Sequence, residues 1–293
     1  MRRSICAILI VLAWSLAACA APAPQGPAIW RIHDADSEIW LFGSVHVLPR
    51  DLKWRTPQID AAFANADEVV METDAASPEA QRSVAALAQR FGALPAGRTL
   101  DDLLDPGERA QLAKAASAAH VDPASLQQLR PWFAALKLSV FYAVAHGEDP
   151  NAGVEQVLFA EAQAHNKPIG YLETPEVQVR VLADLSPADE KRYFDSTLAD
   201  IEQGADDLDA LGAAWARGDT QAMSRLLEPD LHEAGPALYD ALITRRNAHW
   251  ADEIQHRLAG AGHVFIMVGA AHLVGPDSVV ALLRARGVQV EGP

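Results

Sequence analysis

Two stretches near opposite ends of the chain share one pattern of apolar and polar positions. Residues 39–46 (Ile-Trp-Leu-Phe-Gly-Ser-Val-His) and 264–272 (Val-Phe-Ile-Met-Val-Gly-Ala-Ala-His) each run apolar to a glycine and reach a histidine three residues later. A short apolar run bounded by glycine is typical of a buried strand. Open α/β sheets place their sites just beyond the carboxyl ends of strands. The repeat therefore predicts a duplicated unit whose halves bring His46 and His272 to one site.

The rest of the sequence predicts an α/β protein in which the middle of the chain is mostly helical. Strands are expected at 28–33, 38–43, 68–74, 167–173, 263–268 and 287–291, the first two as a hairpin. Helical periodicity and capping residues followed by proline indicate helices at 56–64, 131–146, 154–165, 206–217, 220–227, 235–258 and 276–286, with further starts at Asp105, Asp122, Thr174 and Ser186. Both ends therefore run strand, Gly-x-x-His, helix and strand, with a large helical insertion between them.

The amino terminus predicts export and lipidation. A basic start, an apolar run at 5–13 and the sequence Leu-Ala-Ala-Cys ending at Cys19 resemble a bacterial lipoprotein signal. An ordinary secretory signal cut nearby is the alternative. Ala20, where such signals can carry aspartate, favours an outer-membrane lipoprotein facing the periplasm. The expected parts are a signal peptide at 1–18, a lipidated Pro/Ala-rich tether at 19–28 and a single domain at 29–293.

Composition and charge exclude several classes of site and partner. Cys6 lies in the predicted signal and Cys19 would carry the lipid, so the remaining chain has no thiol for a disulfide, a nucleophile or a cysteine zinc site. The net charge of −15 becomes −17 without Arg2 and Arg3, which argues against a nucleic-acid partner. The sequence also lacks the His-Glu-x-x-His, Gly-x-Ser-x-Gly and P-loop signatures.

The remaining candidates suggest a metal site. Two neutral imidazoles and a carboxylate form a familiar divalent-metal set, which here would be His46, His272 and Glu72, with Mn, Co or Zn bound. Binding should weaken as histidines protonate near pH 6.5. Glu173 ends another predicted strand and is either the general base or a salt-bridge partner of Arg246. Asp74 is either close to the site or a helix cap.

Several ordered motifs resemble the TraB/GumN family over about Ile29 to Val290. Besides the two Gly-x-x-His motifs they are Val-Val-Met-Glu72, Arg130-Pro-Trp-Phe-Ala-Ala, Gly153-Val-Glu155, Gly170-Tyr-Leu-Glu173-Thr, Trp215-Ala-Arg-Gly-Asp219 and Arg246-Asn247-x-x-Trp250. That family includes the Tiki metalloproteases and is distantly similar to erythromycin esterase and the ChaN haem-binding proteins. The resemblance implies a three-layer, mixed β-sheet core with an internal duplication, and a site built from both histidines and Glu72. The family more often has aspartate in place of Glu155.

The functional prediction is a peptidase-like, metal-dependent hydrolase that acts on a peptide or another small substrate, as the resemblance implies. Its metal ligands would be His46, His272 and Glu72, and its catalytic residues Glu173, Glu72 and Arg246. Supporting residues would be Gly43, Ser44, Asp74, Glu155, Asn247 and Gly269. Two alternatives remain: a haem- or metal-binding lipoprotein without catalysis, and a non-catalytic regulator of polysaccharide export, as the family name suggests.

Overall fold

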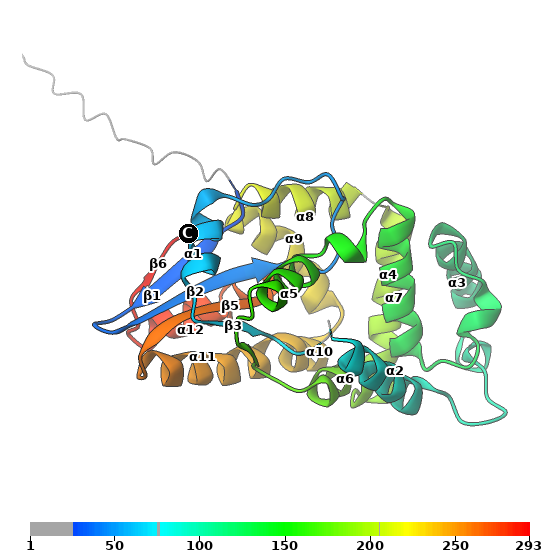
Figure 1. Ribbon diagram of the computed structural model, residues 1–293. Coiled ribbons are helices and arrows are strands. Elements are labelled where there is room, and N and C mark those ends of the chain that lie inside the picture. The colour runs from blue at the N-terminus through cyan, green and yellow to red at the C-terminus, as the bar shows by residue number, and fades with distance from the viewer. Residues whose placement is uncertain (1–25, 75–76, 205) are drawn as a thin grey trace, which may run out of the picture.

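The computed structural model describes residues 26–74, 77–204 and 206–293 (Figure 1). The predicted signal peptide and Cys19 lie outside these ranges. Within them, six strands form one sheet in the order β4-β3-β5-β2-β1-β6. Their bounds are β1 Ile29–His33, β2 Ser37–Ser44, β3 Glu68–Met71, β4 Ile169–Tyr171, β5 Gly262–Gly269 and β6 Val290–Glu291. The pairs β2·β5, β5·β3 and β3·β4 are parallel, whereas β1 runs antiparallel to β2 and β6. The predicted mixed sheet is confirmed.

Helices cover both faces of the sheet. One face packs against α1 (Pro57–Asn65), α5 (Val154–Ala164), α8 (Asp206–Ala216) and α9 (Thr220–Glu233), and the other against α11 (Arg245–Leu258) and α12 (Val279–Ala285). β5 shows why: Phe265 and Met267 belong to the first apolar cluster, and Ile266 and Val268 to the second. A strand buried on both faces needs a continuous apolar run rather than an alternating one. The result is the expected three-layer core.

Part of the helical insertion forms a lobe beside the sheet (Figure 1). Its helices are α2 (Pro78–Gly92), α3 (Pro106–Ala118), α4 (Pro131–Ala145), α6 (Pro175–Ala183) and α7 (Pro187–Gln203). A third apolar cluster joins α3, α4 and α7. The short turns are η1 (Leu100–Leu103), η2 (Pro123–Leu126), η3 (Pro150–Ala152), η5 (Ala270–His272), α10 (Pro236–Tyr239) and the π-turn η4 (Asp240–Thr244). No helix in the described ranges is both long and apolar enough to cross a membrane.

Capping chemistry sets most helix starts. The side chains of Thr56, Ser77, Thr174 and Ser186 each accept a hydrogen bond from a backbone N–H of the first turn, with proline following the cap. Asp105 and Glu108 form the predicted capping box of α3. Asp122 differs, because the helix that it caps is only the four-residue turn η2.

Two predicted helices need correction. The predicted helix at 220–227 continues to Glu233 as α9. The single helix expected at 235–258 is instead α10, the π-turn η4 and α11. A π-turn adds a residue to the turn and is often found at functional sites. Arg246 and Asn247, in the first turn of α11 after this π-turn, are both buried.

The two repeated stretches form the centre of the sheet. β2 and β5 are parallel neighbours, with Gly43 opposite Val268 and Ser44 opposite Gly269. Both histidines therefore follow strands that end at the same edge of the sheet, as the duplication predicts. The lobe faces this edge of the sheet (Figure 1). A cavity lined by both lies between them.

Candidate functional site

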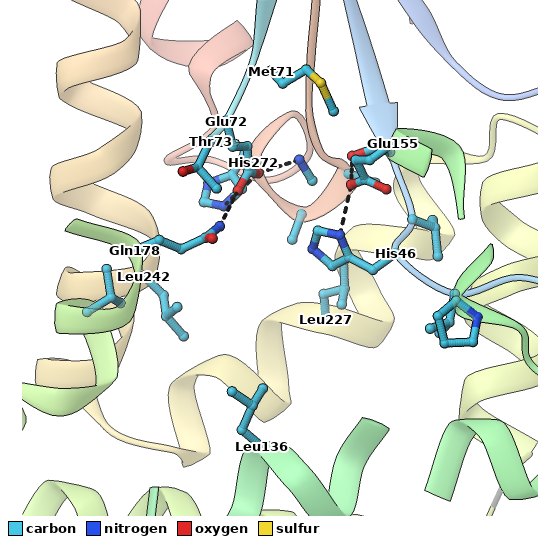
Figure 2. Close-up of a pocket in the computed structure, with 18 of the residues that line it drawn as sticks. His46, Met71, Glu72, Thr73, Leu136, Glu155, Gln178, Leu227, Leu242 and His272 are labelled. Carbon is cyan, nitrogen blue, oxygen red and sulfur yellow. Dashed lines mark hydrogen bonds and ion pairs between the residues drawn. The ribbon is translucent and has the colours of Figure 1, made fainter. Parts of the chain in front are cut away.

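A cavity of about 700 Å³ lies between the carboxyl ends of β2, β3 and β5 and the helical lobe (Figure 2). Its polar end gathers side chains from the strand ends and from α5 and α11, namely Ser44, His46, Glu72, Glu155, Arg246 and His272. The other walls come from α2, α4, α6, α8 and α9 and are mostly apolar. A cavity of this size with a few convergent polar groups is the usual form of a small-molecule site.

Glu72 lies directly after β3 and is held from several sides. Its Oε1 accepts a hydrogen bond from the backbone N–H of Gly269 at 2.6 Å, and its Oε2 accepts from Arg246 Nη2 at 2.9 Å and Gln178 Nε2 at 3.3 Å. A Cβ at position 269 would lie 3.1 Å from Oε1, so glycine permits this close approach. The buried Glu72 carboxylate is thus fixed in orientation at the cavity edge.

His272 is fixed by Asn247 behind it. Asn247 Nδ2 donates to the carbonyl of Asp277 at 2.8 Å, which orients the amide so that its Oδ1 faces His272 Nδ1 at 2.6 Å. Nδ1 therefore carries the proton and donates to Asn247, which leaves the Nε2 lone pair directed towards Arg246 Nη1 at 3.1 Å and Glu72 Oε1 at 3.8 Å. The ring also packs against Trp250, with centroids 4.5 Å apart.

Arg246 uses every N–H of its guanidinium inside the protein. Nε and Nη2 bind the two oxygens of Glu173 at 3.1 and 2.7 Å, Nη2 also binds Glu72, and Nη1 contacts the Leu242 carbonyl and His272 Nε2. Glu173 is therefore a bidentate partner of arginine, with a side chain only 4% exposed, and it does not line the cavity. This geometry favours the salt-bridge interpretation of Glu173 over the general-base role, and a positioning role for Arg246.

Burial and charge separate the pKa values in this cluster. Burial would raise the pKa of Glu72, but the nearby positive charges of His272, Arg246 and His46 and the Gly269 N–H outweigh it and lower the pKa to about 2. Burial, reinforced by the Arg246 charge, lowers the pKa of His272 to about 4 despite the opposing pull of Glu72. At neutral pH His272 is therefore neutral, and Arg246 is the cation beside an ionised Glu72.

His46 forms the second half of the site with Glu155. Its Nδ1 lies 2.9 Å from Glu155 Oε1, which also accepts from Ser44 Oγ. The charge of Glu155 raises the pKa of His46 to about 9, against the effect of burial. The His46 side chain stays 71% exposed, because it projects into the cavity, as Figure 2 shows. At neutral pH His46 is an imidazolium paired with a carboxylate.

Gly153 makes this pairing possible. A Cβ at Gly153 would overlap the carbonyl oxygen of His46, and the N–H of Val154 donates to the carbonyl of Val45 at 3.0 Å. The first turn of α5 thus lies directly against the histidine loop, which brings Glu155 to Nδ1 of His46. The Gly-Val-Glu sequence has a clear physical role: glycine supplies the close approach and glutamate the contact.

The ring nitrogens of the two histidines suit a divalent metal, but their surroundings do so only in part. Metal-binding histidines usually give their second ring nitrogen to a carboxylate or an amide or carbonyl oxygen. His46 does so through Glu155 and His272 through Asn247, so each has Nε2 left for a ligand. Glu155 Oε2 is buried without a hydrogen-bond partner among the described residues, as expected of an atom that awaits one. However, no three His, Cys, Asp or Glu side chains in that part of the chain converge in a ready metal site, and Arg246 contacts Nε2 of His272.

Other predicted residues have supporting positions. The carbonyl of Gly43 accepts from Trp215 Nε1 at 2.8 Å, and a Cβ there would lie 3.1 Å from Ala270. Asp74 accepts hydrogen bonds from the backbone N–H and the hydroxyl of Ser77. It therefore supports the start of α2, but the N-cap of that helix is Ser77 and not Asp74. Gln178 was not predicted. It contacts Glu72 from α6 in the lobe, and no sequence motif links it to the strands.

Comparison with known proteins places the chain in a family. It is 24% identical over 258 residues to the uncharacterized protein YbaP of Escherichia coli (strain K12), covering 88% of this chain and 92% of YbaP. It is 25% identical over 244 residues to YbaP of Shigella flexneri, covering 83% and 87%. Residues 28–292 match the family model described as the TraB/PrgY/gumN family. Because this match spans nearly the whole chain, the protein belongs to the TraB/PrgY/gumN family.

Proposed function

We propose that this protein is a metal-dependent hydrolase, with a divalent ion held by His46, His272 and Glu72. The observation that carries the proposal is the shared arrangement of the two histidines. Each follows one of two parallel neighbouring strands, and each is fixed through Nδ1, by Glu155 or by Asn247. This leaves two Nε2 atoms and a carboxylate at one end of the cavity. When bound, such a metal lowers the pKa of water and polarises a carbonyl.

The chain's own residues have defined tasks in this proposal. Glu155 holds the His46 ring and balances its charge, and Asn247 fixes the tautomer of His272. Arg246 and the Gly269 N–H keep Glu72 ionised in a buried place, where an unpaired carboxylate would otherwise take up a proton. The metal must displace the proton of His46 and the Arg246 contact at His272.

A second candidate is a hydrolase that needs no metal. It is favoured by one observation, the 3.1 Å contact between Arg246 Nη1 and His272 Nε2, which occupies the lone pair that a metal would need. In this version His46, paired with Glu155, would exchange the proton with substrate and water as general acid and base. His272 would then serve only to place Arg246 beside Glu72.

Calorimetry with chelator-treated protein distinguishes the two candidates. Binding of Mn, Co or Zn should be lost in His46→Gln, His272→Gln and Glu72→Gln, and hydrolysis of peptides or activated esters should require the added metal. The matched control is His263→Gln, since His263 lies at the opposite end of β5, exposed and near Asp67. Metal binding that survives the first three changes would refute the metal centre. Hydrolysis that persists without metal but is lost in His46→Gln would establish the second candidate. Metal or haem binding without turnover would favour a carrier.

A further inference from the structure

The cavity is chemically divided, and the proposed chemistry uses only one of its ends. Away from the strand ends, its walls carry leucines from five different elements: Leu136 of α4, Leu182 of α6, Leu211 of α8, Leu227 of α9 and Leu242 of the π-turn. Figure 2 shows Leu242 and Leu227 between the polar side chains and Leu136 in this view. Leu136 is itself 37% exposed, so the apolar wall reaches solvent. An open apolar wall of this extent marks a place that binds something apolar.

Charge limits what the polar end accepts. Three carboxylates line the cavity, Glu72, Glu148 and Glu155, whereas Arg246 has all its donors engaged by protein groups. His46 is matched by Glu155. Among the described residues, these three carboxylates outnumber the two cations that line the cavity, Arg246 and His46. This excess of negative charge in the side chains favours an uncharged ligand over an anion at the polar end.

From this division we propose that the substrate is a neutral long-chain acyl ester, with its acyl chain among the leucines and its ester group beside His46 and Glu72. The proposal rests on the proposed hydrolase function. A methylene occupies about as much space as a water molecule, about 30 Å³, so a chain of roughly fifteen fills about 450 Å³. The cavity of about 700 Å³ holds this chain and the ester group.

The reaction is a simple hydrolysis. Water adds to the acyl carbon, the bond between that carbon and the ester oxygen breaks, and one proton passes to the departing alkoxide to give the alcohol. The second product is a fatty acid, which ionises at neutral pH.

Chain binding is tested separately from catalysis. The probe is a dodecyl ether of a neutral fluorescent dye, which has neither an ester nor an amide bond to hydrolyse. Leu136→Trp should weaken its binding about tenfold or more, since each methylene excluded from the cavity costs about fourfold in affinity. The matched control is Val140→Trp, one turn along the exposed side of α4, 42% exposed and not part of the cavity wall. Equal effects of the two changes, or no binding to wild type, would overturn the proposal.

Chain-length selectivity completes the test. Wild type should hydrolyse nitrophenyl palmitate with a higher kcat/KM than the octanoate, and the octanoate better than the acetate. Leu136→Trp should move the preference to shorter chains, and Val140→Trp should not. His46→Gln should abolish hydrolysis of all three while probe binding persists, which separates the two proposals. Probe binding with no hydrolysis by wild type would sink the hydrolase and with it the ester as substrate. Equal kcat/KM for all chain lengths would overturn the acyl-chain assignment alone.

Discussion

Replacement of Arg246 by methionine tests whether one guanidinium holds the polar cluster together. The side chain is 10% exposed and lies against Glu72 and Glu173, whose side chains are 11% and 4% exposed. Methionine keeps the packing against Trp250, over which the guanidinium lies at 4.5 Å, but leaves two buried carboxylates without a cation. Loss of one partner from a buried ion pair costs about 3–5 kcal/mol.

The pH dependence has a definite sign. In the wild type the pKa of Glu72 is about 2, below its unfolded value, so its contribution to stability is present above about pH 4.5 and is lost as the pH falls towards 2. Without Arg246 the pKa of folded Glu72 should rise above the unfolded value. The destabilisation by Arg246→Met should then be largest near pH 7 and shrink as the pH falls towards 5.

Urea unfolding at about pH 7 and about pH 5 measures this difference. Arg257→Met is the matched control on the same helix, because Arg257 also contacts two carboxylates, Glu68 and Glu253, but both are about one-third exposed. Its loss should cost about 1 kcal/mol or less. Glu173→Gln, added to Arg246→Met, should restore part of the stability. An effect of Arg246→Met no larger than the control, or one that grows at pH 5, would refute the reasoning.

Three further predictions follow from the site and the amino terminus. The pKa of His46 is about 9 and that of His272 is about 4, so metal binding near pH 7 should release one proton. The metal affinity should then rise about tenfold per pH unit up to about pH 9. Ordinary histidines would instead place this rise near pH 6.5. Calorimetry in buffers of different protonation enthalpy measures this release, and its absence would contradict the His46 assignment. Gly153→Ala should move α5 away from the His46 loop, with a cost of about 1–3 kcal/mol and a fall in kcat/KM; unchanged activity and melting temperature would show that the close approach is not needed. Cys19→Ser should shift the protein from the membrane to the soluble fraction on cell fractionation. An unchanged distribution would refute lipidation of Cys19 and favour an ordinary secretory signal.

Some features of the site follow from neighbouring residues alone and could be predicted. The apolar runs that end at Gly43 and Gly269 predict strands, and these two strands prove to be parallel neighbours. Pairing of β3 with β4 extends through the N–H of Glu173, which donates to the carbonyl of Glu72 at 2.8 Å. Two glutamates that each end an apolar strand therefore lie side by side, as strand periodicity suggests. The second of them turned out to face Arg246 rather than the cavity.

Other contacts join segments that no local pattern connects. Glu155 reaches His46 across 109 positions of the chain only because α5 begins against the histidine loop. Gln178 reaches Glu72 from a lobe whose placement depends on the packing of α2 and α6. This packing decides which carboxylate contacts which cation. The sequence around an acidic residue does not, because many acidic residues have similar neighbours along the chain. The general-base role therefore could not be assigned from residue type.

Local sequence was enough to predict most of the helices and strands, because apolar runs, helix caps and the permissive backbone of glycine act over a few residues. It also determined that two histidines end equivalent strands. Tertiary structure alone decided the protonation of those histidines. His46 gains a proton beside Glu155, and His272 loses one beside Arg246 in a buried place. Burial and charge depend on every segment that surrounds a group, so two histidines in matching sequence contexts acquire opposite electrostatic states.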